Sequence, residues 1–336
     1  MLVRYYLSLV IAFVVFLATM VFYFLKTQPQ PQEQQVITGT HYEDITVKGA
    51  IQPIPIKMQV DVQWVRLGKA LFNSTLLSRD NTISCASCHL VNFGGDDGFP
   101  VSTGIDSQVG SRNAPTVLNA VFNFRQFWDG RSQDLADQVS GPVHNPIEMG
   151  SNWPEVINKL RREPEFNNAF LALSPDGVTQ GNIVKAITTF EETLITPNAP
   201  IDRYLMGDAN ALTSQQKRGY DKFLQFGCIA CHQGRNIGGN IYQKLGRIDV
   251  VPKKLLNDTG LFELTKKLDD MYVFKVPSLR NVAETAPYFH NGSVDSLQEA
   301  VKIMAQSQLG TVLSQQDIDD LVALLQSFSA QPYQVE

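Results

Sequence analysis

Apolar residues recur at helical spacing in several separate stretches of the chain. Trp64, Leu67 and Leu71 lie on one face of a stretch that begins near Val62, a pattern typical of an amphipathic helix. The same spacing predicts five further helices, over residues 153–162, 180–196, 213–226, 295–306 and 315–328. Because no stretch alternates convincingly between apolar and polar residues, the pattern predicts a mainly α-helical fold.

Two details concern the interior and the start of these helices. Gly68 lies inside the first helix, where a glycine usually weakens helix formation. Thr213 and Gln216 match a capping box, in which each side chain bonds to the backbone of the other residue. This pair therefore supports the start of the helix over 213–226.

The N-terminal stretch has a different pattern. From Tyr5 to Leu25 the chain carries no charge, and this uninterrupted run is long enough to cross a bilayer as one helix. Positions 22–25 lack the small side chains of a cleavage site, which favours an uncleaved anchor over a cleaved signal peptide. Residues 27–35, TQPQPQEQQ, predict a solvated tether, and residues 36–60, rich in Ile, Val and Pro, predict an extended segment.

The composition is that of a globular chain with a substantial core. Of its 336 residues, 43% are hydrophobic and 18% are charged, and the length suits two domains. Lysine and arginine together number 28 against 33 for aspartate and glutamate, and the stretch 1–26 contributes Arg4 and Lys26 but no acid. The rest of the chain is therefore more acidic than the whole, which argues against nucleic acid as a partner and permits a basic protein partner.

All four cysteines lie in two copies of one short motif, Cys85–His89 (CASCH) and Cys228–His232 (CIACH). In C-x-x-C-H the two thiols form thioethers with the vinyl groups of one haem, and the following imidazole ligates its iron. A structural zinc site would need four ligands from nearby pairs, and a thioredoxin-like motif needs no trailing histidine. The sequence therefore predicts two covalent c-type haems, attached by Cys85, Cys88, Cys228 and Cys231 and ligated by His89 and His232.

The two haem motifs also predict the domain organisation. Each follows a predicted helix, which indicates two cytochrome-c-like units with a boundary near Pro197–Pro200. Haem of this type is attached outside the cytoplasmic membrane, so we expect an inner-membrane anchor with a periplasmic body. The predicted parts are an anchor (1–26), a tether and extended segment (27–60), an N-terminal haem domain (61–198) and a C-terminal haem domain (199–336).

Several longer stretches resemble one family. They are GSRNAPTVLN (110–119), FWDGR (127–131), GPV (141–143), EM (148–149), VPSLRN (276–281) and TAPYFHNG (285–292). These stretches resemble the bacterial di-haem cytochrome c peroxidases, and the resemblance covers roughly residues 60–330. It implies two haem domains facing a shared interface and the reduction of hydrogen peroxide to water. Peroxide would be cleaved at the N-terminal haem, and electrons would enter at the C-terminal haem.

The resemblance also assigns roles to individual residues. Met304, which ends the stretch EAVKIM (299–304), matches the second ligand of the C-terminal haem, with Met271 as the rival. A His/Met pair raises the reduction potential of a haem, which suits a site that stores an electron. Trp128 matches an aromatic residue between the haems, and a large core anchor is the alternative interpretation.

Two further sites rest on the resemblance. Glu148 and Gln138 match the pair above the peroxide-cleaving iron, where one carboxylate can move a proton between the two peroxide oxygens. Asn113, with the carbonyl groups of Thr285 and Pro287, matches a calcium site that bridges the two domains. Calcium accepts such amide and main-chain oxygens together with water.

One position departs from the family pattern. Many members carry a distal histidine in the loop after the first haem motif, and here the corresponding position is Ile105. An aliphatic side chain cannot bind iron, so we expect an open distal face that needs no reductive activation. His144, which shortly precedes Glu148, could instead reach the site as a ligand or acid–base group, or lie on the surface.

The leading prediction is a membrane-anchored di-haem peroxidase that takes electrons from a small periplasmic protein or from membrane quinol. One alternative is a protein-modifying di-haem oxidase of the cofactor-maturation type. Those enzymes carry tyrosine in place of the methionine ligand, so Met304 counts against it. The other is a non-catalytic electron-transfer cytochrome. Homodimers are common in the family, so a dimer is also expected.

Overall fold

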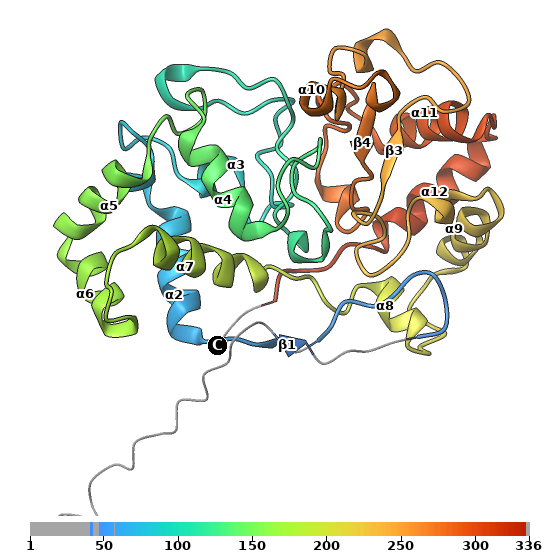
Figure 1. Cartoon of the computed structure of the whole chain (residues 1–336). Helices are drawn as coiled ribbons and strands as arrows, with labels where there is room; N and C mark the ends of the chain where they lie inside the picture. Colours follow the sequence, from blue (N-terminus) through green and yellow to red (C-terminus); the bar gives the residue numbers. More distant parts are fainter. Residues whose placement is uncertain (1–40, 43–46, 57, 334–336) are drawn as a thin grey trace, which may run out of the picture. The chain divides into compact units, whose positions relative to one another are not determined.

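The computed structural model describes residues 41–42, 47–56 and 58–333, which belong to one compact unit (Figure 1). The predicted anchor (1–26) and the predicted tether (27–35) lie outside these residues, as does part of the predicted extended segment (36–60). No helix among the described residues is long and apolar enough to cross a membrane.

Helices dominate both halves of the described chain (Figure 1). The first half contains α2 (Val62–Asn73), α3 (Cys85–Cys88), α4 (Leu135–His144), α5 (Trp153–Arg162), α6 (Pro164–Leu173) and α7 (Gln180–Glu192). The second contains α8 (Pro200–Leu205), α9 (Ser214–Gln225), α10 (Phe262–Thr265), α11 (Leu297–Leu309) and α12 (Gln315–Gln326). Two short antiparallel pairs complete the fold, β1 (His41–Tyr42) with β2 (Met58–Gln59) and β3 (Tyr242–Lys244) with β4 (Val273–Lys275).

The helix ahead of each haem motif crosses a later helix at a glycine. A Cβ atom on Gly68 of α2 would lie 1.9 Å from the carbonyl oxygen of Ala186 in α7. A Cβ atom on Gly219 of α9 would lie 2.1 Å from the carbonyl oxygen of Asp320 in α12. Glycine is therefore required at both crossings because the two backbones touch.

The apolar side chains form separate cores in the two halves. Trp64, Leu71 and Ile187 belong to the core of the first half, and Phe223 and Leu325 to that of the second. The boundary near Pro197–Pro200 remains a prediction.

The segment over residues 47–56 packs on the second half. Ile51 is buried in its core, and the carbonyl of Gln52 accepts a hydrogen bond of 3.0 Å from Nη2 of Arg280. The same guanidinium lies 2.7 Å from Oδ1 of Asp202, and both side chains are fully buried. The buried ion pair thus holds three distant parts of the sequence together.

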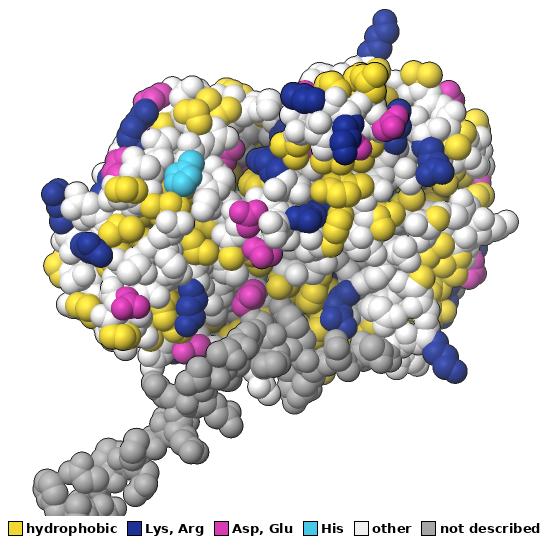
Figure 2. Space-filling model, in the orientation of Figure 1, with side chains coloured by type: hydrophobic (Ala, Val, Ile, Leu, Met, Phe, Trp, Pro, Cys, Tyr) yellow, Lys and Arg dark blue, Asp and Glu magenta, His cyan; other side chains and the backbone are white. Residues whose placement is uncertain are grey.

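Polar contacts also join the two halves beside the haem motifs. The backbone N–H of Asn113 donates to the carbonyl of His290 over 2.8 Å, and that of Lys275 to the carbonyl of Trp128 over 2.9 Å. Arg112 forms ion pairs with Asp129 and Asp258. Elsewhere, on the face shown in Figure 2, charged side chains of both signs are mixed with hydrophobic ones.

The predicted helices occur, with shifted ends. The helix predicted over 180–196 ends at Glu192, because Pro197 has no N–H to donate and disfavours helical backbone at Thr196. Helices α3, α4, α6, α8 and α10 were not predicted. Helix α4 contains Gly141 and Pro142, residues that usually interrupt a helix.

Candidate functional site

The two C-x-x-C-H motifs share one backbone hydrogen bond. In each, the histidine N–H donates to the carbonyl of the first cysteine over 3.0 Å, from His89 to Cys85 and from His232 to Cys228. All four thiols are free. Burial raises the pKa of Cys85 to about 12 and that of Cys228 to about 11, so both thiols are neutral.

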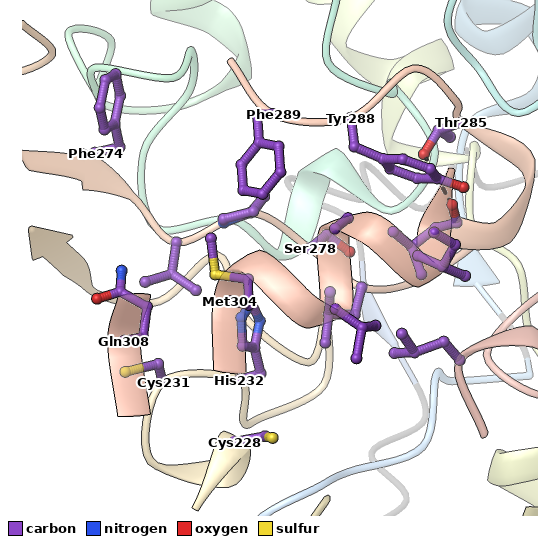
Figure 3. Close-up of a pocket in the computed structure, with 18 of the residues that line it drawn as sticks. Cys228, Cys231, His232, Phe274, Ser278, Thr285, Tyr288, Phe289, Met304 and Gln308 are labelled. Atoms are coloured by element: carbon purple, nitrogen blue, oxygen red, sulfur yellow. Dashed lines mark hydrogen bonds between the residues drawn. The ribbon is translucent and has the colours of Figure 1, made fainter. Parts of the chain in front are cut away.

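The second motif opens on a largely apolar cavity (Figure 3). Cys228, Cys231 and His232 line it together with Met304 from α11, whereas Met271 does not. Burial lowers the pKa of His232 to about 4, so its imidazole is neutral, the form that ligates a metal. The structure therefore brings together the four residues expected at the C-terminal haem.

The motif Cys85–His89 opens on another cavity, here called the N-terminal cavity, which has a volume of about 530 Å³. The cavity at Cys228–His232, here called the C-terminal cavity, has a volume of about 270 Å³. His89 lines the N-terminal cavity, and its Nδ1 lies 3.2 Å from the carbonyl of Gly95, which leaves Nε2 for a metal. Glu148 and Gln138 line the same cavity. All the residues expected at the N-terminal haem thus share one space.

Glu148 is held by its neighbours. Its Oε1 accepts a hydrogen bond of 2.6 Å from Nδ2 of Asn145, and burial raises the pKa of its carboxyl group. Its main-chain carbonyl accepts a hydrogen bond of 2.9 Å from the N–H of Ile105. A carboxylate with a raised pKa in a cavity is suited to accept and return a proton.

The loop around Ile105 packs onto this glutamate segment. A Cβ atom on Gly104 would lie 2.0 Å from the carbonyl oxygen of Ile147. Ile105 is fully buried and does not line the cavity. His144 is exposed and meets the ring of Trp153 at 5.8 Å, also without lining the cavity. Of the interpretations of His144, the structure supports a surface histidine.

Trp128 lines both cavities. Its Nε1 donates to the carbonyl of Asn113 over 3.0 Å, and its ring lies edge-on to His290 with 6.3 Å between the ring centres. The structure therefore places this side chain between the two cavities, where the resemblance expects it. Asn113, Thr285 and Pro287, expected at calcium, line the C-terminal cavity together.

Three buried charged residues line the cavities without having been predicted. Glu191 lies in the N-terminal cavity, and Asp96 and Lys275 lie in the C-terminal one. Charged residues are usually exposed, so isolated ones give no sign of burial. For Glu191 a sign was available, because it lies one helical turn after Ile187 on the apolar face of α7.

Comparison with known proteins agrees with this geometry. A family model described as di-haem cytochrome c peroxidase matches residues 62–210. The chain is 49% identical over 287 residues to cytochrome c peroxidase Ccp of Escherichia coli K12, which covers 83% of this chain and 61% of that protein. It is 45% identical over 282 residues to cytochrome c551 peroxidase of Pseudomonas aeruginosa, which covers 82% of each. The chain belongs to the di-haem cytochrome c peroxidase family.

A solved structure shares the fold of this chain. It is a MauG-like protein associated with microbial copper homeostasis, with a TM-score of 0.73 and 27% sequence identity over 86% of this chain and 95% of that one. The predicted mainly α-helical fold is therefore confirmed. The chain spans 61% of the length of the Escherichia coli relative.

The residues present in the two cavities fit two covalent haems. Each cavity is lined by two cysteine thiols and by an imidazole whose pKa is lowered by burial. Gly238 closes tightly around the second imidazole, since a Cβ atom there would lie 3.3 Å from Nδ1 of His232. The family and the cavities thus agree on the cofactor.

Proposed function

We propose that the protein reduces hydrogen peroxide to two waters, with two electrons and two protons, at the N-terminal haem site. One observation carries the proposal, namely that Glu148 and Gln138 share a cavity with His89, the only histidine among the described residues that line it. An electron-transfer haem would need a second protein ligand there rather than an acid–base pair.

A haem held by Cys85, Cys88 and His89 would bind peroxide and supply the electrons. The side chains that line the N-terminal cavity would then transfer the protons. Oε of Glu148 would accept a proton from one peroxide oxygen and return it to the other, which leaves as the first water. The remaining oxygen would leave as the second water once the two electrons and two protons have been supplied. Asn145, 2.6 Å from Oε1, fixes the orientation of the carboxylate, and the Gln138 amide can hydrogen-bond the bound peroxide.

The distal face of this site is proposed to be open in the oxidised protein. The loop position that carries a histidine in many family members holds Ile105, which is buried outside the cavity. Met149 lines the cavity, but its side chain belongs to the apolar core of the first half. The enzyme would therefore need no prior reduction to bind peroxide.

The C-terminal site is proposed to receive and store electrons. His232 and Met304 would ligate its iron, and such a pair favours the reduced state. Trp128, which lines both cavities, would lie on the path between the two sites. A small periplasmic protein or membrane quinol would be the electron donor.

A calcium ion is proposed beside the C-terminal cavity. Asn113, Thr285 and Pro287 line that cavity, and so does Asp96. The Asp96 side chain is 2% exposed, and its Oδ1 has no hydrogen-bond partner among the described residues. A buried carboxylate beside amide and carbonyl oxygens suits a hard cation that also retains waters.

We also propose that residues 5–25 anchor the enzyme in the inner membrane with its haem sites in the periplasm, and that it forms a homodimer. The anchor and its orientation are supported by the uncharged run from Tyr5 to Leu25 and by the C-x-x-C-H chemistry. Fractionation of membranes carrying the full chain tests the anchor.

A protein-modifying oxidase of the cofactor-maturation type is the second candidate. The solved MauG-like structure with the same fold favours it. The presence of Met304 rather than tyrosine beside His232 favours the peroxidase.

Steady-state peroxide reduction by the full chain, supplied with a reduced electron donor, tests the proposal. We expect Glu148→Gln to lower turnover about 10²–10⁴-fold, the usual contribution of a general acid–base group. Glu165→Gln, an exposed position in α6, is the matched control and should retain full turnover. A wild-type protein that consumes no peroxide, or a Glu148→Gln variant with unchanged turnover, would sink the proposal.

A further inference from the structure

The C-terminal cavity contains a single cationic side chain among the described residues. Lys275, the last residue of β4, is 6% exposed and is the only lysine or arginine that lines the cavity. None of the ion pairs among the described residues includes it. Burial lowers its pKa to about 8, and no carboxylate raises it. A buried ammonium group is costly without an anionic partner, so this position calls for one.

The location of Lys275 indicates which anion it meets. The backbone N–H of Lys275 donates to the carbonyl of Trp128, which lines both cavities, whereas Cys228 and Cys231 line only the C-terminal cavity. The vinyl groups and the propionate carboxylates occupy different edges of a haem. A haem tethered by these cysteines would therefore direct its carboxylates away from them, and Lys275, held beside Trp128, would be available to meet one of them.

The other charged residue of the cavity does not compete for this role. Asp96 is a carboxylic acid, and burial raises its pKa to about 7. It repels a propionate when ionised, and it is assigned above to the calcium ion. Among the described residues of the cavity lining, Lys275 is therefore the one group that can neutralise a carboxylate by charge.

We propose that Lys275 binds a propionate of the C-terminal haem and raises the reduction potential of that haem. This inference rests on the proposal that Cys228 and Cys231 carry a haem. A nearby positive charge favours ferrous over ferric iron, and the effect is strengthened where water is excluded. The backbone N–H of Lys275 also donates to the Trp128 carbonyl over 2.9 Å, which fixes the ammonium-bearing strand beside the residue shared by both cavities.

Spectroelectrochemistry of the full chain carrying both haems tests this inference. The variants are Lys275→Met, Lys275→Gln and Lys275→Arg. Lys244→Met is the matched control, because Lys244 is exposed at the end of the paired strand β3. Haem content is measured first on every variant, so that loss of a haem is separated from a change in its potential.

We expect Lys275→Met and Lys275→Gln to lower the reduction equilibrium constant of the C-terminal haem about tenfold, which is a shift of about 59 mV for one electron. Lys275→Arg should stay within about twofold of wild type. The shift should persist at high salt, since buried charges are screened weakly, whereas any effect of Lys244→Met should vanish.

An unchanged potential in the Met or Gln variant would overturn the inference, and so would an Arg variant with the same loss. If one neutral variant does not accumulate, the other still provides the comparison with Arg. A wild-type protein with a single haem would overturn the haem assignment itself, and this inference with it.

Discussion

Glu191 shows how a single buried residue couples the fold to pH. Its side chain is 6% exposed, and Oε2 has no hydrogen-bond partner among the described residues. Burial raises its pKa from 4.5 to about 8. Between these values the folded protein holds a proton that the unfolded chain has lost, so this group's contribution is fully present below pH 4.5 and is lost as the pH rises toward 8.

We therefore expect Glu191→Gln to gain stability relative to wild type as the pH rises. The amide keeps the shape of the side chain and cannot ionise. The gain should grow by up to about 1.4 kcal/mol per pH unit between pH 5 and pH 8. Thermal unfolding at several pH values measures it, with Glu165→Gln as control. Parallel pH curves for Glu191→Gln and wild type would contradict the assignment.

Residues with chemistry in a fixed spacing were predictable at this scale. The cysteines and histidines of both motifs line the two cavities, and so do Glu148, Gln138 and Met304, whose roles remain predictions. Asp96 and Lys275 were not predictable, because burial of one charged side chain depends on contacts between distant segments. Ile51 and Arg280 illustrate the same limit. Glu191 was missed although its position on the apolar face of α7 indicated burial.

Two glycines set the packing of the helices that precede the haem motifs. The sequence suggested only that Gly68 would weaken its helix. In the structure, Gly68 and Gly219 each lie where two helix backbones touch, so a larger residue would not fit. We expect Gly219→Ala to destabilise the protein by about 1–3 kcal/mol through overpacking against Asp320.

Gly181, near the start of α7, is the matched control. A Cβ atom there meets nothing within 4 Å, so Gly181→Ala should stabilise the protein by up to about 1 kcal/mol through helix propensity. Chemical denaturation of both variants checks the pair. Equal effects would show that helix propensity, and not the crossing, determines the outcome.

Long periodic helices were predictable at the scale of elements, and interrupted ones were not. Helix α5 matches its predicted range, and the Thr213–Gln216 capping box is present at the start of α9. Helix α4 was missed because Gly141 and Pro142 disfavour helix locally, and packing of the helix in the first half overrides that preference.

At the scale of the whole molecule, the two halves meet at the cavity that holds the proposed calcium ligands. Chelation of calcium should lower the midpoint of thermal unfolding, because Asp96 would be left buried and unpaired beside Asn113, Thr285 and Pro287. Calorimetry before and after chelation measures the loss. Calcium should restore the midpoint and magnesium should not, since magnesium retains its waters and prefers an octahedral site.

If chelation leaves the midpoint of thermal unfolding unchanged, the proposed calcium site is wrong. The peroxidase assignment would stand, since it rests on the N-terminal cavity.

The packing of residues 47–56 on the second half was not predictable, because it is set by tertiary contacts such as Gln52 with Arg280.

The most direct test of the open N-terminal site is to mix the fully oxidised full chain with hydrogen peroxide in a stopped-flow instrument and follow the haem absorption. With Ile105 buried outside the cavity, and His89 the only histidine among the described residues that line it, the account predicts a rapid spectral change without prior reduction. No change until one electron per molecule has been supplied would contradict it, because the distal face would then be closed in the oxidised protein.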